Sequence, residues 1–151
     1  MTNLERLQKV ADGLEELNEQ VVYVGGTLPG LYATDPAAPE PRATMDVDCI
    51  VDYGTMAERE MFERWLRQKR FSEYQGEDTV ICRWSFEGEL VDIMPTDERF
   101  YGFTNKWYKQ GMQSKVNLRP WPRAEVATSE EKRISRTLST SWIVALILHR
   151  C

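Results

Sequence analysis

With 151 residues, 42% of them hydrophobic and 28% charged, the chain fits one domain that can bury a sizeable core. Its formal net charge of −5 argues against capture of nucleic acid by general electrostatic attraction, although it leaves room for a local basic patch. No apolar run approaches the length of a membrane span, and the N-terminus lacks the apolar core of a secretory signal. We therefore expect a cytoplasmic protein with no membrane partner.

The cysteines and the single histidine argue against a zinc site. Cys49, Cys82 and Cys151 are widely spaced and form no CxxC pair, and His149 is the only histidine. Cys49 and Cys82 lie in apolar, strand-like runs, where a free buried thiol is the usual interpretation. This pattern is consistent with a reducing cytoplasm.

The first third of the chain predicts a helix followed by a buried strand. Apolar residues recur at steps of three or four over residues 3–19 and form one stripe, made of Leu4, Leu7, Val10, Leu14 and Leu17. A strand is expected over 21–24, ended by Gly25-Gly26. Residues 27–32 predict a turn or a short helix, and the three prolines between 34 and 41 predict an irregular loop.

A second strand is expected over 45–53 and a second helix over 55–70. Thr55 and Glu58 have the spacing of a capping box at the start of that helix. The buried side of the helix is expected to contain Ala57, Met61, Phe62, Trp65 and Leu66.

The third segment predicts a β-hairpin and then an aromatic-rich region. Residues 79–86 alternate as a strand, Glu87-Gly88 forms a turn, and residues 89–94 return. Residues 97–112 predict a helix or loop that packs over the sheet, and 116–119 a short strand. The stretch 124–136 is polar, whereas the apolar residues 142–148 predict a buried helix or strand, or a dimer interface if they are exposed.

Three acids are the candidate metal ligands. Asp46 and Asp48 share one face of their strand, because successive side chains point to opposite faces. Asp92 lies on a later strand on the same face as Leu90 and Met94, and a neighbouring strand can bring it beside the pair. Three carboxylates suit Mg²⁺, which takes oxygen ligands and shares them with phosphates. Two alternatives remain: a solvent-facing acid pair at 46 and 48, and a salt bridge from Asp92 to an arginine such as Arg83.

Together these features resemble the nucleotidyltransferase superfamily, which has the polymerase-β-like fold. The resemblance covers about residues 3–110, and it rests on the order helix, strand, Gly25-Gly26, Asp46-Val47-Asp48, helix, and a later strand with Asp92. In detail the chain is similar to bacterial nucleotidyltransferases of abortive-infection and toxin–antitoxin systems. Their motifs are matched by Val24-Gly25-Gly26 and by Arg42, Thr44, Asp46 and Asp48.

The resemblance implies an α+β fold, with a mixed and mainly antiparallel sheet and helices packed on one side. It also implies transfer of a nucleoside monophosphate from an NTP, ATP for example, to a hydroxyl acceptor on a protein, an RNA or a small molecule. Asp46, Asp48 and Asp92 would be catalytic and would hold two Mg²⁺ ions. The nucleotide-binding residues would be Gly25, Gly26, Thr27, Arg42 and Thr44. A homodimer or an antitoxin-type partner is also implied.

The chain also departs from the family pattern. The gap between Gly26 and Asp46 is long because of the proline-rich insert. We expect residues 1–121 to form the nucleotidyltransferase-like domain, and residues 122–151 to be an atypical C-terminal segment that resembles a truncated or frameshifted end. The alternative function is therefore a catalytically inactive nucleotidyltransferase-like module that binds nucleotide or protein.

Overall fold

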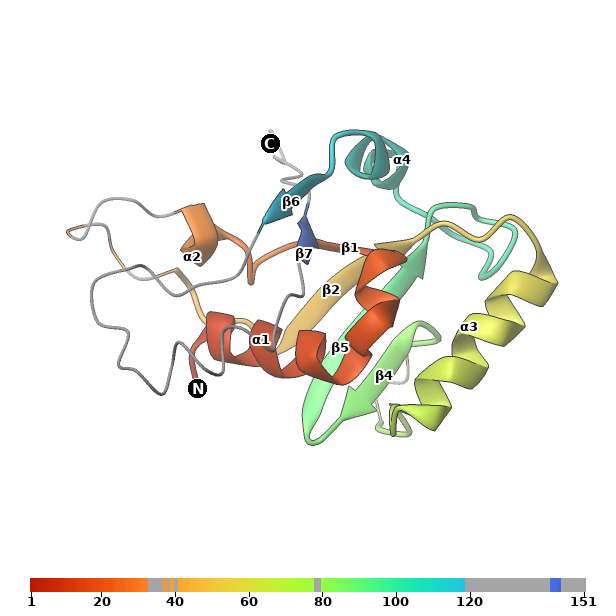
Figure 1. Cartoon of the computed structure of the whole chain (residues 1–151), viewed down its shortest axis with the longest axis horizontal. Coiled ribbons are helices and arrows are strands. Elements are labelled where there is room, and N and C mark those ends of the chain that lie inside the picture. Colours follow the sequence, from red (N-terminus) through yellow and green to blue (C-terminus); the bar gives the residue numbers. More distant parts are fainter. Residues whose placement is uncertain (33–36, 38, 40, 78–79, 119–141, 145–151) are drawn as a thin grey trace.

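The chain folds around one mixed β-sheet (Figure 1). The computed structural model describes residues 1–32, 37, 39, 41–77, 80–118 and 142–144. The helices are α1 (Asn3–Leu14), the 3-10 helix η1 (Glu15–Glu19), α2 (Pro29–Tyr32), α3 (Met56–Gln68) and α4 (Lys106–Gln113). The strands are β1 (Val21–Val24), β2 (Asp46–Val51), β3 (Ser72–Glu73), β4 (Arg83–Phe86), β5 (Glu89–Pro95), β6 (Val116–Leu118) and β7 (Trp142–Val144).

The strand order is β3-β4-β5-β2-β1-β7-β6. β2 pairs with β5 and β1 with β7 in parallel, whereas the other neighbouring strands are antiparallel. The predicted α+β class with a mixed, mainly antiparallel sheet is therefore confirmed. β7 lies beside β1, so the segment 122–151 supplies one strand to the sheet built by residues 1–121.

Helices α1 and α3 cover one face of the sheet, and the main core lies beneath them (Figure 1). Val47, Cys49 and Val51 of β2 point into this core because they alternate along the strand. Leu7 and Leu14 of α1 are fully buried against them, as the apolar stripe predicts. On α3 the buried side is narrower than expected: Phe62, Leu66 and the partly buried Trp65 form it, whereas Ala57 and Met61 are exposed.

The opposite face of the sheet carries a smaller apolar cluster. Val22, Val24 and Ile50 form it, and α4 packs against it through Tyr108 and Met112. The cluster covers only part of this face. The sheet therefore has one face buried by two helices and an opposite face that carries both apolar and polar side chains.

Both α1 and α3 begin with a complete capping box. Thr2 and Glu5 bond to each other's backbone N–H groups at the start of α1, and Thr55 and Glu58 do the same at α3, which confirms the prediction for α3. The first α-helix is shorter than predicted and ends at Leu14, because Glu15 adopts a φ of 51°. Asn18 then donates to the carbonyls of Ala11 and Glu15.

The predicted strand over 79–86 is too long at its start. β4 begins at Arg83, because the N–H of Arg83 donates to the carbonyl of Val80 across a turn instead of continuing a ladder. Other predictions lie mostly or wholly outside the described residues: the loop at 34–41, the polar stretch 124–136, and Cys151. In the ranges that are described, no helix combines the length and apolar character that crossing a membrane requires.

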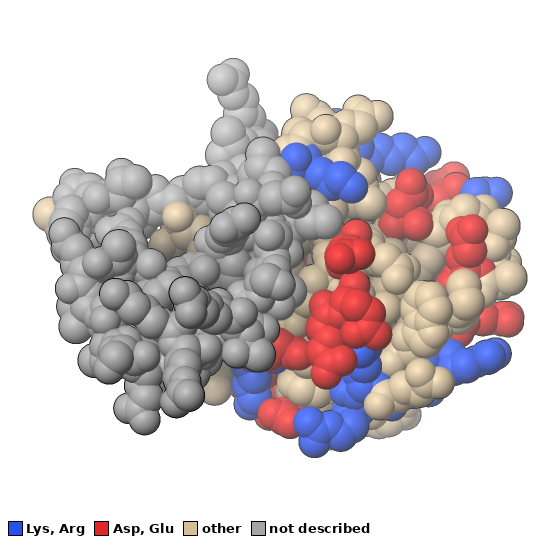
Figure 2. Space-filling view, viewed as in Figure 1, with Lys and Arg blue, Asp and Glu red and all other residues tan. Residues whose placement is uncertain are grey.

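Figure 2 views the molecule from the side of α1 and shows acidic side chains in the middle of the described surface, with basic ones around them. Several of these charges pair, as where Lys69 contacts Glu15 and Glu16 at 2.7 and 2.8 Å. The described part of this face therefore presents no unbroken basic surface, in agreement with the acidic net charge.

Candidate metal site on the polar face of the sheet

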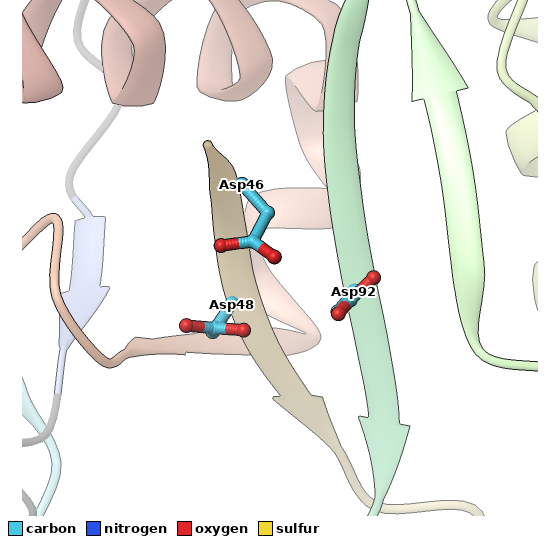
Figure 3. Close-up of side chains that lie close together, drawn as sticks. All are labelled: Asp46, Asp48 and Asp92. Atoms are coloured by element: carbon cyan, nitrogen blue, oxygen red, sulfur yellow. The ribbon is translucent and has the colours of Figure 1, made fainter. Parts of the chain in front are cut away.

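Three carboxylates meet on the polar face, at the centre of the sheet (Figure 3). Asp46 and Asp48 come from β2, and Asp92 comes from the neighbouring strand β5. Each offers a carboxylate oxygen such that the three oxygens lie within 4.8 Å of one another. The structure therefore confirms the prediction that a neighbouring strand brings Asp92 beside Asp46 and Asp48.

The register of two parallel strands creates this cluster. Asp48 lies directly opposite Asp92, and Asp46 lies opposite Leu90, so Asp46 is diagonal to Asp92 on the same face. The intervening residue Val47 points into the core and has no exposed area. A slip of one residue would send both acids of β2 into the apolar core, which burial strongly disfavours.

Arg83 is the cation of the cluster. It lies opposite Asp92 across the β4–β5 pairing, and its guanidinium grips that carboxylate with two bonds of 2.7 and 2.8 Å. The same Nη2 group reaches Asp46 at 2.9 Å. The salt-bridge alternative for Asp92 is therefore also realised, and it coexists with the three-acid cluster.

Asp48 lies next to this ion-pair network without a cation of its own among the described contacts. Burial, followed by the neighbouring charges of Asp46 and Asp92, raises the pKa of Asp48 to about 6, although Arg83 acts in the opposite direction. The hydrogen bond to Asp92 in turn raises the pKa of Arg83. The site therefore holds negative charge in excess, as a cation site requires.

The glycine turn after β1 approaches the acids closely. Gly25 has a φ of 82°, and a Cβ there would overlap Oδ2 of Asp48. Only glycine tolerates both the backbone conformation and the close approach without displacing the carboxylate. A Cβ at Gly26 would likewise overlap the methyl group of Thr44. The predicted glycine pair thus lies beside the predicted acids.

Asn3, at the start of α1, ties this turn to the segment before β2. Its side-chain amide donates to the carbonyls of Gly26 and Arg42, at 3.4 and 2.9 Å, and its Oδ1 accepts from the N–H of Thr44 at 3.1 Å. Thr2 takes the N-cap position of α1, and the sequence-based prediction assigned Asn3 no role in the site. No local pattern signals its bonds to residues 23 to 41 positions away.

The predicted nucleotide-binding residues differ in their exposure to solvent. Gly25 and Gly26 are exposed beside the acids, and the Arg42 side chain is exposed. Thr44 is half-buried, and its hydroxyl donates to the carbonyl of Asp46 at 3.3 Å. Thr27 is 1% exposed, and its hydroxyl has no hydrogen-bond partner in the described part of the chain. Phosphates can therefore approach the glycines directly, but they can reach the Thr27 hydroxyl only if the turn moves.

Helix α4 borders the same face. Tyr108 donates from its hydroxyl to Sδ of Met94 at 2.8 Å, on the strand that carries Asp92. Burial raises the pKa of Tyr108 to about 12, and the charges of Asp48 and Asp92 contribute. Lys106, Lys109 and Lys115 lie on or just after this helix, without an acidic partner within ion-pair distance among the described residues.

The donor set fits a hard divalent cation. Mg²⁺ binds oxygens at about 2.0–2.1 Å in octahedral geometry, so neighbouring ligand oxygens lie about 3 Å apart and opposite ones about 4 Å apart. The oxygens of the three acids lie within 4.8 Å of one another, somewhat farther apart than these spacings, so the side chains would have to rotate to hold one ion together. In the described part of the chain, no other cluster of three or more potential ligands was found.

No protein-family model and no curated protein sequence matches this chain. The function is therefore inferred from the chemistry and geometry of the site.

Proposed function

We propose that the protein is a Mg²⁺-dependent nucleotidyltransferase that moves a nucleoside monophosphate from an NTP to a hydroxyl acceptor in the cytoplasm. The observation that carries this proposal is the meeting of Asp46, Asp48 and Asp92 on one face, directly against the Gly25 turn. Carboxylates hold the metal, and exposed backbone beside them leaves room for phosphates.

The chemistry divides among these groups. Asp46, Asp48 and Asp92 would hold the cations, which neutralise the triphosphate and the leaving pyrophosphate. Gly25 and Gly26 would let the phosphates approach the acids, because neither glycine has a side chain in the way. Asp92 would also help to take the proton of the acceptor hydroxyl, and the hydroxyl oxygen would attack the α-phosphorus while pyrophosphate leaves.

Transfer of label from an α-phosphate-labelled NTP, with a cell lysate and purified RNA and protein fractions as acceptors, tests the proposal. Asp46→Asn and Asp48→Asn should each reduce Mg²⁺-dependent transfer by at least about a hundredfold, because the metal loses an anionic ligand. Asp12→Asn, on α1 and remote from the cluster, is the matched control and should retain transfer. Equal transfer by Asp48→Asn and the unchanged chain would refute the assignment.

A second function is supported by the position of Arg83. Because Arg83 forms ion pairs with both Asp46 and Asp92, the fold is also compatible with a catalytically silent module that binds nucleotide or a protein partner. Calorimetry with each NTP separates the two candidates. NTP binding that requires Mg²⁺ supports the nucleotidyltransferase. NTP binding that is independent of Mg²⁺, or no NTP binding, supports the catalytically silent module.

A further inference from the structure

Arg83 reaches across three strands to occupy the metal-binding groups. Its own strand is β4, its two-bond partner Asp92 is on β5, and its third bond goes to Asp46 on β2. The pair is held away from bulk water: the side chains of Arg83 and Asp92 are 18% and 12% exposed. An ion pair with such geometry is far stronger than a surface pair.

A divalent cation and the guanidinium need the same oxygens. Arg83 takes both oxygens of Asp92 and one of Asp46, at 2.7 to 2.9 Å. Two positive groups that share these carboxylates at such distances repel each other strongly in a half-buried site. A cation that binds all three acids therefore weakens the contacts of Arg83, above all those with Asp92, whose two oxygens both accept from the guanidinium.

A displaced guanidinium needs another anion. Leaving an arginine half-buried without a partner is costly, and the described residues offer Arg83 no acid besides Asp46 and Asp92 within ion-pair distance. Phosphate oxygens match the planar fork of arginine as well as carboxylates do. A triphosphate that arrives with the metal brings both the displacing cation and the replacement anion.

We propose that Arg83 is an internal competitor of the metal, which opposes metal binding in the free protein and couples it to triphosphate binding. This inference rests on the proposed function, because it needs a metal and a triphosphate at the same site. It assigns Arg83 a positioning and regulatory role, and it predicts that metal alone binds weakly while metal and nucleotide assist each other.

Titration with Mn²⁺, which shares the oxygen-ligand preference of Mg²⁺, tests the competition directly. Arg83→Met should bind Mn²⁺ alone on the order of tenfold more tightly than the unchanged chain. Arg70→Met is the matched control, because Arg70 is also paired with an acid, Glu87, but is 77% exposed and belongs to another part of the surface. It should leave Mn²⁺ affinity unchanged.

The second measurement is how much a nucleotide analogue strengthens Mn²⁺ binding. Removal of a positive charge alone would not change this gain. In the unchanged chain, the α,β-methylene analogue of the tightest-binding NTP should strengthen Mn²⁺ binding on the order of tenfold, and in Arg83→Met this gain should shrink towards one. Equal gain in both proteins, or unchanged or weaker Mn²⁺ binding by Arg83→Met, would overturn the inference.

Two further variants distinguish a failure of the Arg83 inference from a failure of the proposed metal site. If circular dichroism shows that Arg83→Met does not fold, Arg83→Lys decides: it keeps the charge but loses the two-bond grip, so it should still bind Mn²⁺ several-fold more tightly, and no gain would overturn the inference. Asp48→Asn tests the proposed function instead. If it binds Mn²⁺ as well as the unchanged chain does, the metal site itself fails, whatever Arg83 does.

Discussion

The two faces of the central sheet are built from the same strands but have opposite chemistry. On β2, Val47, Cys49 and Val51 pack beneath α1 and α3, whereas Asp46 and Asp48 of the same strand face the cluster with Arg83. A side-chain period of two lets one strand serve both purposes. The acids are therefore positioned by the core behind them, and we expect the core to determine stability and the polar face to determine ligand binding.

The largest effect on stability is expected on the core face. Phe62→Ala removes a ring that is 1% exposed and packs edge-on against Tyr53, so it should lower the free energy of unfolding by about 3–5 kcal/mol. Met61→Ala, the next residue on the same helix, is 44% exposed and should change it by no more than about 0.5 kcal/mol. Urea denaturation measures both.

The same two variants test whether the core face and the polar face of the sheet are independent of each other. While folded, Phe62→Ala should bind Mn²⁺ with unchanged affinity, because Phe62 lies behind the sheet and touches none of the acids. A large loss of Mn²⁺ affinity in that variant would mean that the two faces are not separable.

On the polar face, Asp48 should make the metal-free protein less stable as pH rises. Its pKa is raised to about 6 in the folded state, above the value of an unfolded chain, so the folded state binds the proton more tightly. Relative to Asp48→Asn, the unchanged chain should lose up to about 3 kcal/mol between about pH 4 and about pH 6 and stay lower above that range.

Denaturation of both proteins in chelator, over this pH range, measures the difference. Saturating Mg²⁺ should reverse its sign near neutral pH, because the metal stabilises the ionised carboxylate of the unchanged chain and Asp48→Asn cannot supply it. A difference that is independent of pH would mean that Asp48 is not buried beside like charges.

Gly25 allows a sharper test of how closely the polar face is packed. Gly25→Ala and Gly88→Ala both put a side chain at a φ above 80°, and this backbone strain alone should cost each variant about 1–2 kcal/mol. Only at Gly25 does the new Cβ overlap Asp48, since a Cβ at Gly88 meets nothing within 4 Å. Gly25→Ala alone should therefore weaken Mn²⁺ binding, and an equal loss in Gly88→Ala would contradict the site.

Much of the core face was predictable from the sequence, because its signals are local. Apolar periodicity predicts α1 and α3, and the spacing of Thr55 and Glu58 predicts where α3 begins. The errors have local causes too. Glu15 ends α1 early through an unusual φ, and the apolar run before Arg83 forms a turn although its composition suits a strand.

The polar face was predictable only in part, since its key relations are not local. Alternation places Asp46 and Asp48 on one face, but nothing in the sequence states that β2 and β5 are parallel neighbours with Asp48 opposite Asp92. The sequence left Arg83 as an alternative partner of Asp92, whereas the structure shows that it also reaches Asp46. The bonds of Asn3 to the glycine turn have no sequence signal at all.

Loss of a capping box at α1 or α3 should have a small effect on stability. The two losses should differ in their effect on Mn²⁺ binding. Thr2→Ala and Thr55→Ala each remove the hydroxyl that accepts the N–H of the third helical residue, at 3.2 Å in both cases, so each should cost about 1 kcal/mol. Only α1 begins next to the site, because the residue after its cap, Asn3, holds Gly26, Arg42 and Thr44. Fraying of α1 should therefore weaken Mn²⁺ binding a few-fold, whereas fraying of α3 should not. If denaturation shows equal losses and Mn²⁺ titration shows no difference, the start of α1 stabilises the fold without positioning the acids.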